Sequence, residues 1–341
     1  MNNNSRRRSW LNDSSVVILI FLVINILTIS SPLTYILAPV LLPVFLLSVF
    51  AVSGQTTFVL AAGIGLIPYL LLGDGRSTVA MLFPVILMLV VQYLIIMYRP
   101  KPAWALAITT LAAFVGIVIN GYLSIYILQA SDFVQFSTQI ADSIRTEFLA
   151  MLTNGTYELP PSQAESIRQL SNSITPEFIQ DLVPGIVISW SMVSGYLSLR
   201  FAKRFLKQEH FKGVETPTFG ELRISPFLLV FFLVLSGSGI YLTANDQRLG
   251  SLLFNTGYGV VTFLGAVGAM SLVWSFLTVY LKYKRNFTKL VFTLSSLYFF
   301  SGSWMTILTI IDSVFDFRNL SNKSLWHWIR YKIKKSTKEA D

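Results

Sequence analysis

The stretch LGSLLFNTGYGVVTFLGAVGAMSLVWSFLTVYL, residues 249–281, contains no Asp, Glu, Lys or Arg. About 20 apolar residues, in a helix that rises about 1.5 Å per residue, cross a hydrocarbon core of about 30 Å. Further uncharged stretches reach or approach that length along the chain, at 14–73, 77–98, 102–131, 182–199, 224–245 and 290–311. The sequence therefore predicts an all-α fold, a polytopic bundle of transmembrane helices.

The composition supports a membrane protein and excludes several classes of function. Of the 341 residues, 53% are hydrophobic and 13% are charged, a balance that would make a soluble chain aggregate. The chain has no cysteine and only two histidines, so we expect no disulfide, no metal site and no cofactor. Its net charge of +9 comes from Lys and Arg beside apolar stretches, which indicates a lipid bilayer as partner and no nucleic acid.

The first uncharged stretch, 14–73, is too long for one helix. It is interrupted at Ser30-Ser31-Pro32 and again at Ser53-Gly54-Gln55, and such residues are typical of turns. Three passes therefore fit this stretch. With the later stretches the chain has eight or nine apolar segments, at 16–29, 33–52, 57–72, 78–98, 103–128, 183–201, 224–242, 252–281 and 290–311.

The distribution of Lys and Arg predicts the orientation, because basic loops resist translocation. The N-terminus and the loops after the fourth, sixth and eighth segments are basic, and all four fall on one side if every segment crosses. We expect that side, with the N-terminus, to be cytoplasmic. Segment 132–182 holds seven acids against two arginines and is expected on the outer side.

The C-terminal tail does not fit this pattern. If 290–311 crosses the membrane, the basic tail falls outside; if it folds back around Ser301-Gly302-Ser303, the tail stays inside. We expect a full crossing, because the segment has the length of a span. On either side, apolar residues spaced among lysines predict an interfacial amphipathic helix in the tail: Leu325, Trp326, Trp328, Ile329 and Ile333.

Changes in charge and hydropathy divide the chain into five regions. They are a basic cytoplasmic N-terminus, N-terminal membrane helices, extracytoplasmic amphipathic helices, C-terminal membrane helices with a basic cytoplasmic loop at 200–223, and a basic amphipathic tail. Their bounds are 1–13, 14–130, 131–182, 183–314 and 315–341.

The outer segment has its own helical pattern. Apolar residues recur at spacings of three and four from Phe133 to Met151, and Asn154-Gly155 would end that helix. Ser162 and Glu165 have the spacing of a capping box for a second helix, and a third short helix could start at Thr175. These helices either connect the spans along the membrane surface or cover the mouth of the bundle.

Polar and small residues within the spans indicate helix packing first. Asn25, Gln92 and Asn120 are typical of interhelical hydrogen bonds, more often than of ligand sites. Gly265 and Ala269 form a small-xxx-small pair that predicts close packing of the eighth segment. The alternative is that glycines of the seventh and eighth segments break these helices around a binding site.

Sequence signatures of enzymes are absent. GxxxxGK[ST], HExxH and GxSxG do not occur, so we expect neither an enzyme nor an ATPase. The best-defined polar group is Asp312, Asp316 and Arg318, at the end of the last apolar stretch. The two acids share a helix face, and Arg318 could pair with either. The group is either an interfacial helix end with one salt bridge or a contact for a partner or polar solute.

Short motifs carry a family resemblance. They are Asp312 to Arg318, Leu182-Val183-Pro184 opening a span, Arg200 to Arg204 ending it, Pro217-Thr218-Phe219, and Arg223 to Pro226. Together they resemble the YybS-like family of bacterial membrane proteins of unknown function. That resemblance implies a multi-pass protein of the bacterial inner membrane. More remotely, the family is similar to substrate-binding subunits of energy-coupling-factor transporters and to MreD, and it implies no ligand residues here.

Two hypotheses of function follow from different classes. In the first, the protein is a substrate-binding or transport-related subunit that has no ATPase of its own and encloses a small uncharged solute. In the second, it is a non-enzymatic organiser or scaffold of the cell envelope, and its basic loop at 200–223 binds a membrane or cytoplasmic protein partner.

Overall fold

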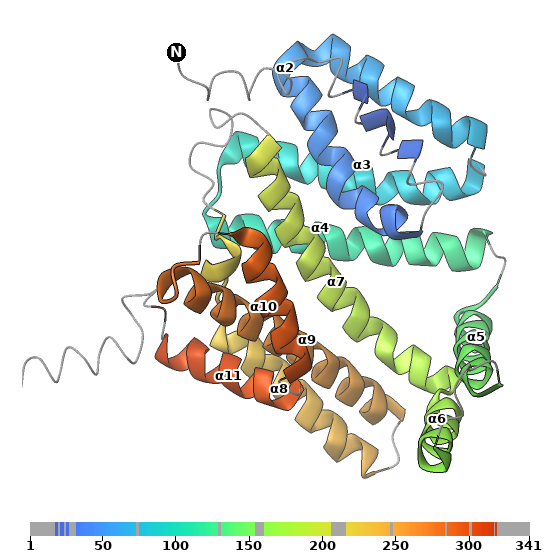
Figure 1. Cartoon of the computed structure of the whole chain (residues 1–341). Coiled ribbons are helices and arrows are strands. Elements are labelled where there is room, and N and C mark those ends of the chain that lie inside the picture. The colour runs from blue at the N-terminus through green and yellow to red at the C-terminus, as the bar shows by residue number, and fades with distance from the viewer. Residues whose placement is uncertain are drawn as a thin grey trace, which may run out of the picture. The chain divides into compact units, whose positions relative to one another are not determined.

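The structure is a computed structural model. It describes residues 18–19, 21–23, 25–26, 32–72, 75–128, 131–153, 160–205, 216–245, 248–283, 285–299, 302–316 and 318, and every regular element in these residues is a helix (Figure 1). Four helices are long and apolar enough to cross a membrane: Pro102–Tyr126, Pro176–Arg204, Pro226–Thr243 and Arg248–Val279. Shorter apolar helices accompany them. The prediction of an all-α polytopic membrane bundle is confirmed.

The chain forms two compact units. Unit 1 consists of Met1–Pro176 and Trp190–Thr216, and unit 2 consists of Glu177–Ser189 and Pro217–Asp341. Helix α7, Pro176–Phe205, contributes its N-terminal part to unit 2 and its C-terminal part to unit 1. Two predicted regions, the basic N-terminus and the amphipathic tail helix, lie outside the described residues, as does 206–215 of the basic loop.

In unit 1, helix α2, Pro32–Leu72, is bent sharply and folds back on itself (Figure 1). The ring centroids of Phe50 and Phe58 are 5.7 Å apart, whereas eight residues of straight helix would separate them by about 12 Å. Leu42 on the first arm packs in one cluster with Ala61 on the second. The bend therefore coincides with the predicted interruption at Ser53-Gly54-Gln55, and the two arms are the two predicted passes.

Unit 1 also contains α3, Gly75–Tyr98, and α4, Pro102–Tyr122, which continues as the π-helix η3, Leu123–Leu128. The C-terminal part of α7 packs against both. A Cβ on Gly195 would lie 2.9 Å from the Cα of Thr110, so this helix crossing requires glycine. The buried amide of Gln92 donates a hydrogen bond to Ser198. Gln92 therefore joins two helices, as predicted.

In the sequence, α5, Phe133–Thr153, and α6, Pro161–Ser173, come between α4 and α7. The predicted amphipathic helix is confirmed, although its stop at Asn154-Gly155 lies outside the described residues. The predicted capping box is wrong: Pro160 is the N-cap of α6, because a proline at the first helical position sets the start, and Ser162 lies within the first turn. The predicted third helix starts as expected, with Pro176 in its first turn, but it is not a separate short helix, since α7 continues from Pro176 to Phe205 without a break.

In unit 2, α8, Pro226–Thr243, and α9, Arg248–Val279, form an antiparallel hairpin. A Cβ on Gly239 would lie 2.7 Å from the Cα of Phe254, and one on Gly257 would lie 2.9 Å from the Cα of Ser236. The glycines thus let the two backbones approach closely. Both helices are continuous, so the alternative that glycines break them around a binding site is wrong.

The last apolar stretch forms two helices, α10, Asn286–Phe299, and α11, Gly302–Phe315 (Figure 1). Each has 14 residues and is about 21 Å long, shorter than the hydrocarbon core of about 30 Å. Residues 300–301 between them lie outside the described residues.

The start of α10 and the end of α11 lie near the same end of α9. Lys289, in the first turn of α10, has its Nζ 3.4 Å from Thr278 Oγ1, near the C-terminal end of α9. A Cβ on Gly302, where α11 begins, would lie 3.2 Å from Thr262, much earlier in α9. After α11 the chain is back at Ser271, which accepts a hydrogen bond from Arg318. The expected full crossing of 290–311 is therefore wrong, and the re-entrant alternative holds.

Candidate functional site

Asp312 and Asp316, at the end of α11, and Arg318, just after it, come together in a buried network of unit 2. Arg318 Nη2 donates a hydrogen bond of 2.6 Å to Asp312 Oδ2, and the two side chains are only 4% and 5% exposed. The sequence left open which acid Arg318 pairs with. The structure selects Asp312.

Arg318 also binds the chain that leads into α8. It donates hydrogen bonds to the carbonyl oxygens of Gly220 (2.8 Å) and Leu222 (3.2 Å) and to Ser271 Oγ (2.6 Å). Ser271, on α9, donates in turn to the carbonyl oxygens of Phe219 and Leu222. One side chain therefore holds the C-terminal end of α11, the C-terminal part of α9 and the segment before α8.

Asp316 has a different partner, Arg223, which the sequence did not single out for this role. The Arg223 Nη1 to Asp316 Oδ2 distance is 3.4 Å, and Arg223 Nη2 donates a hydrogen bond of 2.6 Å to the Ser313 carbonyl oxygen. Asp316 is completely buried and has a φ of 52°, in the left-handed region. That conformation turns the chain away from α11 and directs Arg318 back toward Asp312.

The segment that the two arginines bind, residues 217–225, is ordered by local contacts too. It contains the short helix η4, Phe219–Glu221, and the Thr218 amide donates a hydrogen bond of 2.8 Å to Glu221 Oε2. The Phe219 ring packs edge-on against Trp274, with centroids 5.8 Å apart. The described end of the basic loop is thus a fixed structure on α9.

The buried ion pairs position this segment more than they stabilise the fold. Removing two charges from water costs about as much as their attraction returns, so a buried pair is weak evidence of stability. Asp312 Oδ1 and the Nε atoms of Arg318 and Arg223 are buried without a hydrogen-bond partner among the described residues. The ion pairs hold the segment in one position, but they leave these buried polar atoms without hydrogen bonds.

Gly265 and Ala269, the predicted packing pair, lie buried on the face of α9 that meets α11. A Cβ on Gly265 would lie 2.7 Å from the Cα of Thr306. The Gly265 carbonyl oxygen accepts a hydrogen bond of 2.7 Å from Thr309 Oγ1. Gly265 therefore packs directly against α11, and Ala269 is buried one turn further along α9.

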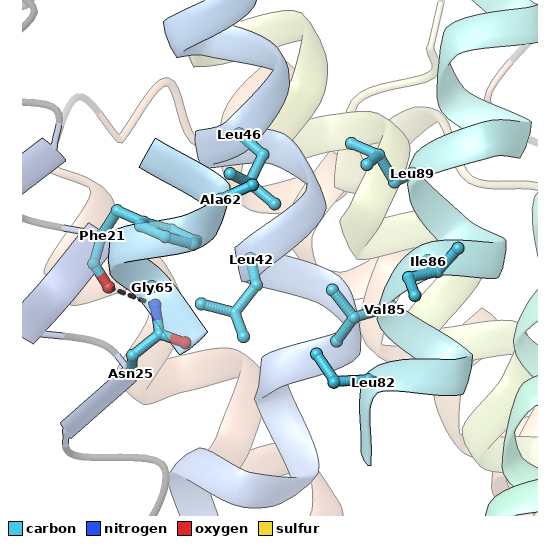
Figure 2. A pocket seen from close by; sticks show the side chains of 10 residues that line it. All are labelled: Phe21, Asn25, Leu42, Leu46, Ala62, Gly65, Leu82, Val85, Ile86 and Leu89. Carbon is cyan, nitrogen blue, oxygen red and sulfur yellow. Dashed lines mark hydrogen bonds between the residues drawn. The ribbon is translucent and has the colours of Figure 1, made fainter. Parts of the chain in front are cut away.

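Unit 1 contains a cavity of about 180 Å³ among the two arms of α2, the helix α3 and the chain near residues 21–25 (Figure 2). Its lining is apolar apart from one amide: Phe21, Asn25, Leu42, Leu46, Ala62, Gly65, Leu82, Val85, Ile86 and Leu89. The sequence did not predict this cavity, because it depends on how far α2 folds back.

Asn25 is the polar group of this cavity. Its side chain is 2% exposed, and Nδ2 donates a hydrogen bond of 2.7 Å to the Phe21 carbonyl oxygen. Figure 2 shows the amide nitrogen turned toward the Phe21 carbonyl oxygen and the amide oxygen on the other side of the group. A buried amide in an otherwise apolar wall is the feature that would orient a bound molecule.

A second polar cluster lies at the N-terminal end of α9. The amide nitrogen of Asn255 is 3.5 Å from Asp181 Oδ2, and Arg248 donates a hydrogen bond to Gln180. Asp181, which lies in the acidic segment 132–182 that we expect on the outer side, is buried. The reason is that α7 starts before Asp181 and carries it into unit 2.

Comparison with curated proteins and with solved structures finds no match. The family described as Predicted membrane protein (DUF2232) matches residues 19–313. The match covers most of the chain and includes the cavity, the spans of both units and the paired acid Asp312. Several apolar helices of unit 1 and unit 2 accord with that description. The chain therefore belongs to the DUF2232 family of predicted membrane proteins.

Proposed function

We propose that this protein binds a small uncharged solute in the bacterial inner membrane, as a substrate-binding or transport-related subunit that has no ATPase of its own and is not an enzyme. The observation that supports this proposal is the apolar cavity of unit 1, whose lining includes the amide side chain of Asn25 (Figure 2). The resemblance to the YybS-like family, and more remotely to energy-coupling-factor substrate-binding subunits, is consistent with it.

The cavity limits the kind of solute. An apolar cavity of about 150 Å³ holds a molecule the size of benzene, whereas drug-sized ligands need about 300 Å³ or more. The volume of about 180 Å³ therefore takes a single ring or a short aliphatic group. A charged group would be costly against this lining, but one hydroxyl or amide donor could pair with Asn25 Oδ1.

Mass spectrometry of small molecules released from the purified protein tests this proposal. We expect an uncharged molecule in stoichiometric amount from the parent protein. Ala62→Phe fills the cavity and should abolish its recovery, while Leu60→Phe, two residues away on an exposed face, should not. Equal recovery from both variants, or recovery of phospholipid alone from the parent, would overturn the proposal.

A second function, that of a scaffold of the cell envelope, is supported by a different observation. The segment 217–225 is held in one position by Arg318 and by the pair of Arg223 with Asp316. Such pairs add little stability to the fold. Their role could instead be to hold a fixed surface for a protein partner. A stoichiometric envelope protein that copurifies with the parent, and is lost with Arg318→Ala, would favour this function.

A further inference from the structure

The walls of the unit 1 cavity differ in how far they are exposed. On one side the lining residues are buried, namely Phe21 and Asn25 near the N-terminus and Leu42 and Leu46 on the first arm of α2. The Phe21 ring also occupies the space that a Cβ on Gly65 would need, so it fits closely against the second arm. The cavity is therefore closed on this side.

The side formed by α3 is partly open. Ile86 lines the cavity and is 55% exposed, so the lining meets the outer surface of unit 1 at this residue. Leu82 and Leu89 lie on the same face of α3, four residues before and three after Ile86, and both are half-buried. Figure 2 shows these three residues across the cavity from Phe21 and Asn25.

The position of Ile86 in the sequence gives the depth of this opening. Ile86 lies ten residues after Arg76 and thirteen before Arg99, and no charged residue comes between these two arginines. At about 1.5 Å per residue these separations are about 15 Å and 20 Å along the helix. A hydrocarbon core of about 30 Å therefore has its middle near Ile86.

The surface around the opening is apolar as well. Phe83 and Val90, which flank Ile86 on α3, are both exposed. On the second arm of α2 the exposed residues among those described from 59 to 67 are apolar too: Val59, Leu60, Gly63, Ile64 and Ile67. The opening of the cavity is thus toward acyl chains rather than toward water.

We propose that the ligand of this cavity is a neutral molecule dissolved in the hydrocarbon of the bilayer, and that it enters sideways past Ile86. This inference rests on the proposed function and adds the source of the ligand. The ring or short aliphatic group that fits about 180 Å³ passes from acyl chains into a lining of the same polarity. One donor on the ligand then finds the amide of Asn25 inside.

Two photoreactive probes test the opening. Both carry one phenyl ring with a diazirine group; in the first the compound is free, and in the second the ring is attached to the terminal carbon of an acyl chain of phosphatidylcholine. The attached ring can reach the cavity only from the hydrocarbon layer. The full-length protein is reconstituted in phosphatidylcholine vesicles and irradiated, and mass spectrometry of peptides locates the label. We expect both probes to label the buried Leu42 and Leu46.

The two probes separate the inference from the proposed function. Labelling of Leu42 and Leu46 by the free probe alone would show a cavity that binds a ring but has no opening to the hydrocarbon, and it would overturn the inference only. Labelling of these residues by neither probe would overturn both.

A matched pair of variants tests the route past Ile86. Ile86→Trp places a larger ring across the opening and should remove the labelling of Leu42 by the attached probe. Val90→Trp, one turn further along α3 at an exposed residue that does not line the cavity, should keep it. Size-exclusion profiles show that both variants are folded. Unchanged labelling of Leu42 in Ile86→Trp would overturn this route.

Discussion

Arg318 and Asp312 form a buried ion pair of 2.6 Å, although α11 has ended between them. Helical geometry alone cannot place residues six apart on one face within hydrogen-bond distance. The pair exists because Asp316 adopts a left-handed backbone conformation and reverses the chain. A local turn therefore joins the end of the re-entrant hairpin to the segment that precedes α8.

Arg318→Ala should lower the free energy of unfolding in detergent by about 3–5 kcal/mol, because it leaves the buried Asp312 carboxylate without a counter-charge. Asp312→Ala/Arg318→Ala should lose less than the sum of the two single changes. Arg145→Ala, which removes the pair of the half-buried Arg145 with the exposed Asp142, is the control and should cost about 0–1 kcal/mol. Strictly additive losses at Asp312 and Arg318 would contradict the coupling.

Asp316→Gly should be less destabilising than Asp316→Ala. Both changes remove the carboxylate that Arg223 contacts. The left-handed backbone conformation is unfavourable by about 1–2 kcal/mol for alanine but not for glycine. Thermal unfolding of the two variants gives the difference directly. If alanine is equal to glycine or better, the turn after α11 does not depend on the φ of residue 316.

The sequence identified Asp312, Asp316 and Arg318 because they are charged residues directly beside an apolar stretch. It could not choose between the two acids, since that choice depends on the φ of Asp316. It also missed Arg223, which lies about 90 residues away in a loop whose basic residues have a simpler explanation in membrane orientation. The spacing of residues in the sequence cannot predict an ion pair between residues so far apart in the chain.

The uncharged stretches at 102–131, 182–199, 224–245 and 249–281 each coincide with a helix long enough to cross a membrane, because the hydrocarbon core excludes charge over a known length. The same reasoning failed at 290–311, where length alone favoured a crossing. A pair of 14-residue helices has the same composition as one span, so hydropathy cannot distinguish them. Only Ser301-Gly302-Ser303 indicated the turn. The cavity beside Asn25 was beyond prediction for a similar reason, since the bend of α2 fixes its size.

Gln92→Leu should change stability by less than about 1 kcal/mol. An interhelical hydrogen bond in a membrane contributes about 0.6 kcal/mol on average, and the Oε1 of Gln92 is buried without a partner among the described residues. Leucine keeps the volume and removes that unpaired oxygen. Thermal unfolding of Gln92→Leu and of Gln92→Leu/Ser198→Ala measures the effect. A large loss in the single variant would show that this contact determines the packing of α3 on α7.

Gly265→Leu should lower the yield of folded protein in detergent, because a side chain there would push Thr306 and the whole of α11 away from α9. Gly259 is the matched control on the same helix, since a Cβ at that position meets nothing within 4 Å. Gly259→Ala should be neutral or add up to about 1 kcal/mol, as expected for glycine replaced by alanine within a helix. Size-exclusion profiles and thermal unfolding of Gly265→Ala, Gly265→Leu and Gly259→Leu complete the series. Equal tolerance of leucine at both positions would mean that α11 does not pack on Gly265, and the re-entrant arrangement would then lose its main contact.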